Sequence, residues 1–110
     1  MPEPVPTVDV GTANGRGGAI VLLDVREDDE WAAGHAPGAV HVPLGTLQQD
    51  SVAADATVYC ICRSGGRSGK AAEALRGAGI QAHNVVGGMQ AWALAGHPIE
   101  AGDGTAGSVI

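Results

Sequence analysis

The chain has 110 residues, 45% of them apolar, and a formal net charge of −6 at pH 7. This length suits a single domain with one modest core, and the excess of acidic residues argues against a nucleic-acid partner or an acidic membrane surface. Aromatic residues make up only 3% and phenylalanine is absent, so valine, isoleucine, leucine and alanine must fill the core.

Residues 1–18 are expected to form an N-terminal edge segment that is partly flexible. Residues 1–6 lack the cationic and long apolar parts of a signal peptide. The two cysteines are spaced C-x-C, which is too close for a disulfide framework. We therefore expect a cytoplasmic protein. Residues 7–10 predict a first edge strand. Residues 12–18 contain three glycines and an asparagine, so a helix there is expected to be frayed or absent.

The next elements are a continuous apolar strand over residues 19–24 and a short helix over residues 28–33. Trp31 is the expected anchor of this helix, and the acidic residues at its start complement the helix dipole. Asp24 ends the strand. We interpret it as a structural carboxylate that pairs with an arginine such as Arg26, with a catalytic role as the alternative.

Residues 34–38 have the composition of a turn and lead into a short strand over residues 39–42. His35 is expected to hold this turn by a hydrogen bond. A metal site made from His35, His41 and the two cysteines is the alternative, but these residues lack the spacing of known zinc sites. We therefore predict no metal.

The most informative stretch is residues 57–75, which reads as a buried strand over 57–62, a tight polar loop over 63–66 and a helix from Gly69. The loop glycines allow successive backbone N–H groups to turn inward, and the helix N-terminus adds partial positive charge. Such a loop binds an anion. Cys62 lies where the strand becomes the loop.

The nearest anion is the thiolate of Cys62, because a cysteine at a helix N-terminus beside arginines can have its pKa lowered by roughly two units. Arg63, Arg67 and Lys70 are three of the six cationic residues, and no carboxylate occurs within residues 63–70. They would attract a small anion to the nucleophile. Cys60 lies inside the apolar run and is interpreted as a buried hydrophobic residue, with a resolving thiol as the alternative.

The chain continues with a strand over residues 81–86, a glycine turn, and a helix over residues 89–94 that packs through Trp92. Residues 101–110 are expected to be a flexible tail. Strands that alternate with helices at short intervals predict an α/β fold with a parallel sheet and the cysteine loop at the carboxyl end of its central strand.

The cysteine loop resembles the active-site loop of the rhodanese family of sulfurtransferases, and further stretches match that family in the same order. These are Leu22-Leu-Asp-Val-Arg-Glu27, Glu30-Trp31, Gly34-His-Ala-Pro-Gly-Ala39, Val42-Pro-Leu44 and Val86-Gly-Gly-Met-Gln-Ala-Trp92. The resemblance implies a rhodanese-like α/β domain over residues 19–100, with about five short parallel strands flanked by helices on both faces. It implies no metal and no organic cofactor.

For function, the resemblance implies that Cys62 takes a sulfane sulfur from an anionic donor such as thiosulfate and becomes a persulfide. The sulfur would then pass to a thiophilic acceptor such as cyanide or a thiol, or to a sulfur-relay protein. The backbone of Ser64, Gly65 and Gly66 would cradle the persulfide, and Arg63 and Arg67 would attract the donor. Two successive displacements predict ping-pong kinetics.

Two other functions are considered. A phosphatase of this fold would need five residues between cysteine and arginine, whereas four separate Cys62 from Arg67. A non-enzymatic sulfur carrier or protein-interaction module stays open, because a fold does not determine a function. The sequence does not identify the physiological donor, the acceptor or the oligomeric state.

Overall fold

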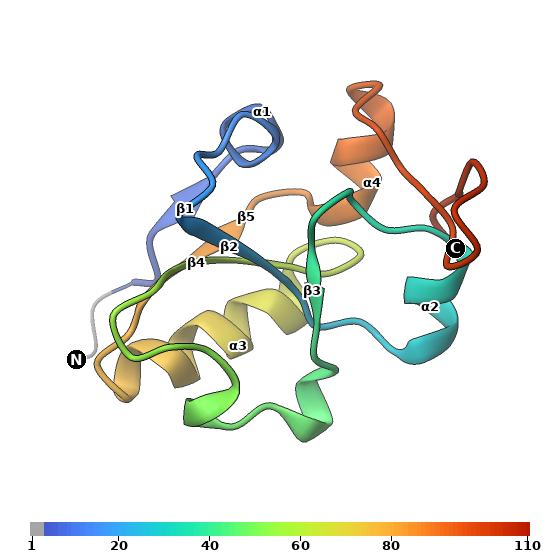
Figure 1. Ribbon diagram of the computed structural model, residues 1–110. Helices are drawn as coiled ribbons and strands as arrows, with labels where there is room; N and C mark the ends of the chain where they lie inside the picture. Colours follow the sequence, from blue (N-terminus) through green and yellow to red (C-terminus); the bar gives the residue numbers. More distant parts are fainter. Residues whose placement is uncertain (1–3) are drawn as a thin grey trace.

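The computed structural model describes residues 4–110 and contains one five-stranded, fully parallel sheet (Figure 1). The strands lie in the order β1-β5-β4-β2-β3. Their bounds are β1 Thr7–Val8, β2 Ile20–Asp24, β3 Val40–His41, β4 Thr57–Ile61 and β5 Gln81–Val85. The predicted fold class is confirmed, with β4 as the central strand.

Strand register brings the site residues together at one edge of the sheet. Leu23 of β2 pairs with Cys60 of β4, and Asp24 pairs with Ile61. Both strands therefore end at the same level, and the Val25 N–H donates to the Ile61 carbonyl at 3.0 Å. As predicted, the loop that follows β4 lies at the carboxyl end of the central strand, where α/β proteins place their sites.

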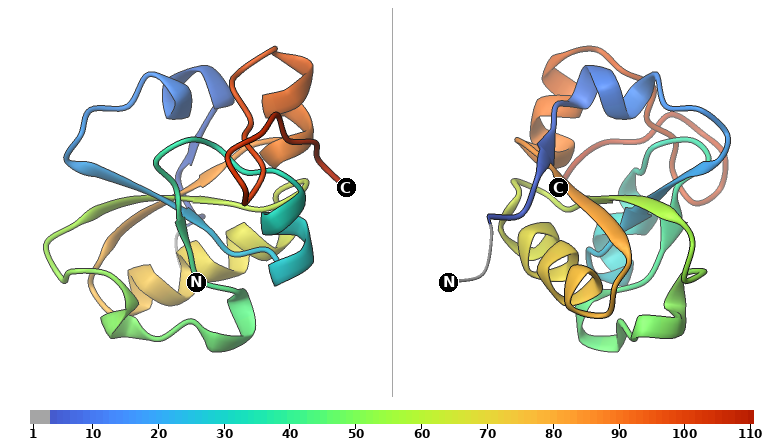
Figure 2. Two further views of the ribbon diagram at one scale, coloured as in Figure 1. Left: turned by 45° about the vertical axis from the view of Figure 1, so that its right-hand side comes forward. Right: turned by 90° about the vertical axis from the view of Figure 1, so that its left-hand side faces the viewer.

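Helices cover both faces of the sheet (Figure 2). On one face, α3 packs Ala71, Ala72 and Leu75 against the sheet. On the other, α1 and α4 contribute Ala13, Met89 and Trp92. The bounds are α1 Val10–Asn14, α2 Asp28–Ala33, α3 Gly66–Gly77 and α4 Gly88–Leu94, with 3₁₀ turns at Leu44–Thr46 and Gln49–Ser51. No helix within residues 4–110 is long and apolar enough to cross a membrane.

The helix after the cysteine loop begins three residues earlier than the sequence suggested. Gly65 caps it with a φ of 119°, a left-handed conformation that favours glycine, and the Gly69 N–H donates to the Gly65 carbonyl at 3.1 Å. Gly66 is therefore the first residue of α3. The loop between Cys62 and this helix is shorter than predicted, which brings the helix N-terminus closer to the sulfur.

The expectation of a frayed or absent helix over residues 12–18 is wrong for residues 12–14, which belong to α1. The predicted first strand, residues 7–10, is shorter than expected, because α1 begins at Val10. The Asp9 carboxylate caps this helix by accepting the Thr12 N–H at 2.7 Å. Ala13 is fully buried against the core beside α4. A cap and one buried contact thus offset the poor helix propensity, and the glycines at 15, 17 and 18 only end the helix.

Residues 101–110 form a folded segment, where the sequence predicts a flexible tail. The Ala101 N–H donates to the Thr105 carbonyl at 2.7 Å, and the Ser108 N–H donates to the Ala33 carbonyl of α2 at 2.9 Å. Gly34 lies so close to the Ser108 backbone that any side chain there would collide with it. Backbone hydrogen bonds to α2 hold this segment, and Val109 packs against the core cluster that contains Met89 and Trp92. A composition rich in glycine did not indicate these contacts.

Candidate active site

Cys62 follows β4 directly and lies at the floor of the loop, with its side chain 1% exposed. The start of α4 holds the backbone where the cysteine loop begins, because the Cys62 carbonyl accepts the Met89 N–H at 2.8 Å and the Arg63 carbonyl accepts the Gln90 N–H at 3.0 Å. Gly88 has a φ of 56°, and a side chain on it would collide with the Cys62 carbonyl. A glycine at position 88 therefore lets the start of α4 pack directly against the backbone of Cys62.

Two donors point at the sulfur of Cys62. The Gly65 N–H lies 3.1 Å from Sγ and the Ser68 hydroxyl lies 3.2 Å from it. Burial opposes ionisation of the thiol, but these hydrogen bonds, together with the backbone N–H groups of Ser68 and Ser64, outweigh it and lower the pKa of Cys62. The predicted direction of the pKa shift agrees, but its cause is hydrogen bonding rather than the arginines.

The sequence did not indicate Asn84, which lies on β5 and forms hydrogen bonds with the cysteine loop and with the first turn of α3. Its Nδ2 donates to the Gly65 carbonyl at 3.0 Å, and its Oδ1 accepts the Ser68 hydroxyl at 2.6 Å. Asn84 therefore positions both groups that contact Cys62 Sγ. The sequence signal was an amide side chain near the end of a predicted strand, between a half-buried His83 and a buried Val85.

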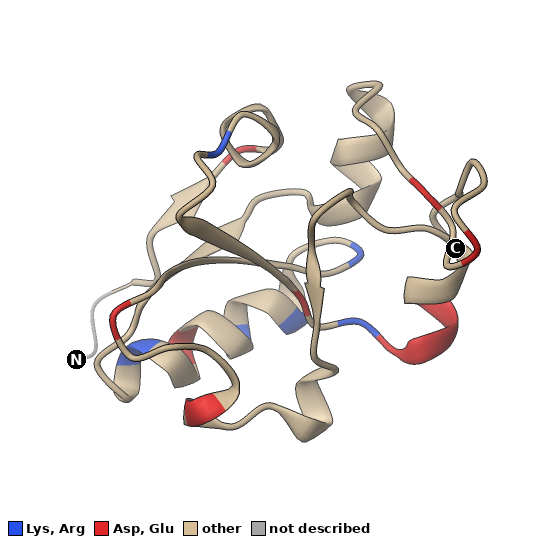
Figure 3. Ribbon diagram, viewed as in Figure 1, with Lys and Arg blue, Asp and Glu red and all other residues tan. Residues whose placement is uncertain are grey.

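Arg67 does not point a free guanidinium at the loop mouth. Its two terminal nitrogens donate to the two carboxylate oxygens of Glu30 on α2, at 2.6 and 2.8 Å. The hydrogen bonds from Arg67 lower the pKa of Glu30 to about 2, so this acid is ionised at neutral pH. Figure 3 shows the acidic first turn of α2 on the same side of the molecule as the basic start of α3. No acidic residue occurs within residues 63–70 of the sequence, but the fold brings Glu30 of α2 into contact with Arg67.

The other predicted site residues surround the mouth of the loop. Arg63 is exposed, and its Nε donates to the Ile110 carbonyl at 3.1 Å. Ser64 and Gly66 are also exposed, while Gly65 is half-buried. The structure therefore brings the predicted loop residues together around Cys62. Among residues 4–110, neither Arg63 nor the exposed Lys70 makes an ion pair with an Asp or Glu side chain.

Cys60 is fully buried in the core, which confirms its interpretation as a hydrophobic residue. Burial, with a smaller contribution from the negative charge on Cys62, raises the pKa of Cys60 to about 12. The Cys60 thiol therefore stays protonated at neutral pH. Of the two cysteines, only Cys62 lies beside groups that stabilise a thiolate.

The polar residues around α2 pair with one another, and Asp24 pairs with Arg26 as the sequence indicated. Asp24 and Arg26 are both 0% exposed and form an ion pair at 2.8 Å, and Arg26 also donates to the Gly34 carbonyl at 2.7 Å. His35 Nδ1 lies 2.8 Å from the Trp31 carbonyl, so His35 does hold the turn. The Trp31 ring stacks on His35 with centroids 3.6 Å apart. These contacts anchor α2 and hence its Glu30.

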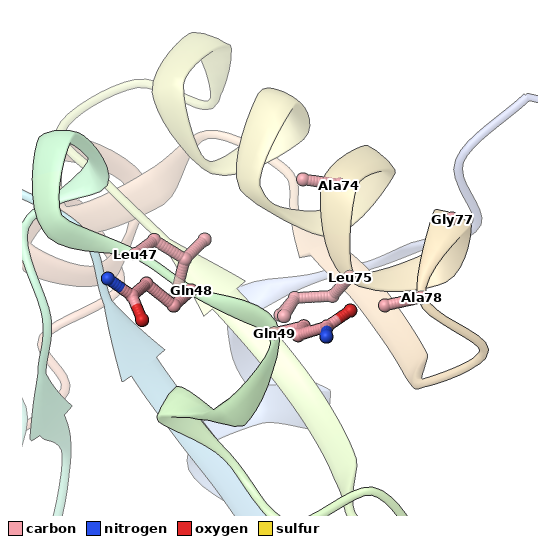
Figure 4. A pocket seen from close by; sticks show the side chains of 7 residues that line it. All are labelled: Leu47, Gln48, Gln49, Ala74, Leu75, Gly77 and Ala78. Carbon is pink, nitrogen blue, oxygen red and sulfur yellow. The ribbon is translucent and has the colours of Figure 1, made fainter.

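A hollow of about 240 Å³ lies between a 3₁₀ turn and the end of α3 (Figure 4). Its lining contains no charged side chain and consists of Leu47, Gln48, Gln49, Ala74, Leu75, Gly77 and Ala78. The hollow lies beside the C-terminal end of α3, whereas Cys62 lies at the N-terminal end of this helix. The hollow is therefore separate from the cysteine loop.

Residues 9–95 match the family model described as the Rhodanese-like domain. This chain belongs to the rhodanese family. A rhodanese-related protein from Thermoplasma volcanium has the same fold, with a TM-score of 0.80, 28% identity, and coverage of 86% of this chain and 96% of that one. The five-stranded parallel sheet and the loop after β4 are thus a rhodanese fold.

Two curated relatives come from Bacillus subtilis (strain 168). The "Putative sulfurtransferase YtwF" is 41% identical over 75 residues, covering 66% of this chain and 73% of the relative. The "Putative sulfur carrier protein YrkF" is 40% identical over 74 residues, covering 64% of this chain. The match spans 40% of the length of YrkF and 59% of another relative of the same organism, YqhL.

Proposed function

We propose that this rhodanese domain is a sulfurtransferase in which Cys62 carries the sulfur as a persulfide. The observation that supports this most directly is the pair of donors on Cys62 Sγ, the Gly65 N–H at 3.1 Å and the Ser68 hydroxyl at 3.2 Å. Hydrogen bonds to an anionic sulfur favour the thiolate, which is the nucleophilic form of cysteine. The names of relatives such as YtwF agree with this chemistry.

The proposed reaction consists of two displacements. The Cys62 thiolate attacks the outer sulfur of a donor such as thiosulfate, a Cys62 S–S bond forms, and sulfite leaves with the electron pair of the broken bond. A thiophilic acceptor, cyanide or a thiolate, then attacks the outer sulfur of the persulfide and regenerates the Cys62 thiolate. The loop N–H groups of Ser64, Gly65 and Gly66 stabilise the anionic sulfur in both steps.

No step of this proposal calls on a metal or an organic cofactor, because thiolate and sulfane sulfur exchange sulfur directly. A sulfur-relay protein would serve equally as donor or acceptor, since a protein persulfide offers the same outer sulfur. Both cysteines are free thiols, which agrees with a reducing cytoplasm as the place of action.

The test is the intact mass of the protein after incubation with thiosulfate or with an alkyl persulfide, followed by cyanide. The wild type and Cys60→Ala should gain one sulfur atom and lose it to cyanide, and Cys62→Ser should gain none. Continued phosphate release from a phosphomonoester, lost in Cys62→Ser, would instead support a phosphatase. Absence of sulfur on Cys62 with every donor would overturn the proposal in favour of an interaction module.

A further inference from the structure

The ion pair between Glu30 and Arg67 changes the charge that a donor meets at the loop. Arg67 belongs to the first turn of α3, whose N-terminus faces Cys62 Sγ. Both terminal nitrogens of its guanidinium are used by Glu30, at 2.6 and 2.8 Å. A bidentate carboxylate fills the fork with which arginine would otherwise bind an incoming oxyanion.

Glu30 is itself fixed, so it does not move aside readily for a substrate. Its Oε1 accepts the Glu27 N–H at 3.1 Å as part of the capping box of α2, and its side chain is 13% exposed. Asp28 and Asp29 occupy the same first turn and add negative charge nearby. Arg63 makes no ion pair with an Asp or Glu side chain of residues 4–110; its Nε donates to the main-chain oxygen of Ile110 at 3.1 Å.

We infer that Glu30 is a specificity-determining residue that turns the loop away from dianionic donors and toward thiol persulfides, R–S–S⁻, which carry one negative charge. This inference rests on the proposed sulfur transfer through Cys62. With thiosulfate, the thiolate and the donor bring three negative charges together, whereas with a persulfide they bring two. Because Glu30 occupies the guanidinium of Arg67, the mouth of the loop stabilises the second arrangement better than the first.

The chemical step balances for the preferred donor. The Cys62 thiolate attacks the outer sulfur of R–S–S⁻, the new Cys62 S–S bond forms, and the old S–S bond breaks with its electron pair on R–S⁻. Water protonates the released thiolate to R–SH. No oxidant or reductant is consumed, because sulfane sulfur moves between two sulfur atoms of the same kind.

The variant Glu30→Gln tests the inference, because glutamine still accepts the Glu27 N–H in the capping box and lacks the charge that holds Arg67. Asp29→Asn is the matched control: it removes one charge from the same turn, and Asp29 is exposed and makes no ion pair with Arg67. The double variant Glu30→Gln/Arg67→Gln shows whether the released arginine causes the change. Circular dichroism and thermal melting check that each variant folds.

The readout is kcat/KM at low ionic strength with two donors, thiosulfate and the persulfide of 2-mercaptoethanol. We expect Glu30→Gln to raise kcat/KM about tenfold for thiosulfate and less than about threefold for the persulfide. The increase for thiosulfate should disappear in the double variant and become smaller at higher salt concentration. The persulfide of a cysteine-containing peptide is a third donor. A gain in Glu30→Gln for thiosulfate that exceeds the gain for both persulfides supports the inference.

Equal gains for both donors, or a gain no larger than that of Asp29→Asn, would overturn the role of Glu30 while sulfur transfer itself stands. A tenfold preference of the wild type for thiosulfate over both persulfides would overturn it as well. Absence of sulfur on Cys62 with all three donors is a different result, which overturns the proposed function and this inference with it.

Discussion

Asn84 Oδ1 and Cys62 Sγ compete for the proton of the Ser68 hydroxyl, whose oxygen lies 2.6 Å from Asn84 Oδ1 and 3.2 Å from Cys62 Sγ. A hydroxyl has a single hydrogen, so it donates to one acceptor at a time. When Cys62 is a thiol, its S–H can donate to Ser68 while Ser68 donates to Asn84. When Cys62 is a thiolate, the Ser68 proton is needed at the sulfur. The charge on Cys62 and the orientation of Ser68 are therefore coupled.

Ser68→Ala should raise the pKa of Cys62 and slow sulfur transfer at pH 7 about tenfold, because a hydrogen bond to a charged group is lost. In the wild type, the rate should fall as the pH drops through the lowered pKa of Cys62, below the value of ~8.5 for an ordinary thiol. In the variant, the midpoint of the pH–rate profile should move upward. Ser108→Ala, which removes an exposed hydroxyl from another segment, is the control. An unchanged midpoint in Ser68→Ala would show that Ser68 does not stabilise the thiolate.

The two cysteines should differ sharply in reactivity. Burial raises the pKa of Cys60 to about 12, whereas hydrogen bonds lower that of Cys62. At pH 7, iodoacetamide should therefore modify Cys62 and leave Cys60 intact until the protein is unfolded. Peptide mass mapping of native and denatured samples measures this. Rapid native labelling of Cys60 would contradict its placement in the core.

Gly88→Ala should damage the cysteine loop specifically. Gly88 has a φ of 56°, and an added Cβ would lie 2.7 Å from the Arg63 carbonyl oxygen and closer still to that of Cys62. Gly96 has a φ of 76° with open space around it, so Gly96→Ala costs only about 1–2 kcal/mol of backbone strain. We expect Gly88→Ala to lower the free energy of unfolding further and to reduce sulfur transfer at least tenfold, since the loop backbone must move. Equal effects of the two variants would show that the close approach is unimportant.

The buried pair of Asp24 and Arg26 should be essential for stability rather than for chemistry. Both side chains are 0% exposed, so Asp24→Asn leaves the Arg26 charge buried without a counter-charge. The expected loss is about 3–5 kcal/mol in the free energy of unfolding, measured by urea denaturation. Asp50→Asn, at an exposed acid, should change it by less than about 0.5 kcal/mol. A stable Asp24→Asn variant without sulfur transfer would instead support a catalytic Asp24.

Local patterns predicted most of the fold and the core of the site. The apolar run of β4, the glycine-bearing loop and the alanine-rich α3 follow one another within 21 residues, 57–77, so periodicity and turn chemistry were enough to place Cys62 at a strand end. The short α1 was not predicted, because the cap at Asp9 and the buried contact of Ala13 outweigh the low helix propensity of its sequence. The pairing of residues 101–110 with α2 was missed because backbone groups make it.

Residues that are neighbours in the chain were enough to predict Cys62 as the candidate nucleophile, the loop that follows it, and the alternation of strands and helices that favours a parallel sheet. The groups around the sulfur depend on contacts between distant parts of the chain. Asn84 reaches the loop from β5, 22 positions beyond Cys62, and Glu30 reaches Arg67 from α2, 37 positions away. Hydrogen bonds and ion pairs act over a few ångströms of space, so side chains distant in the chain set the charge state of Cys62 and the free charge at its mouth.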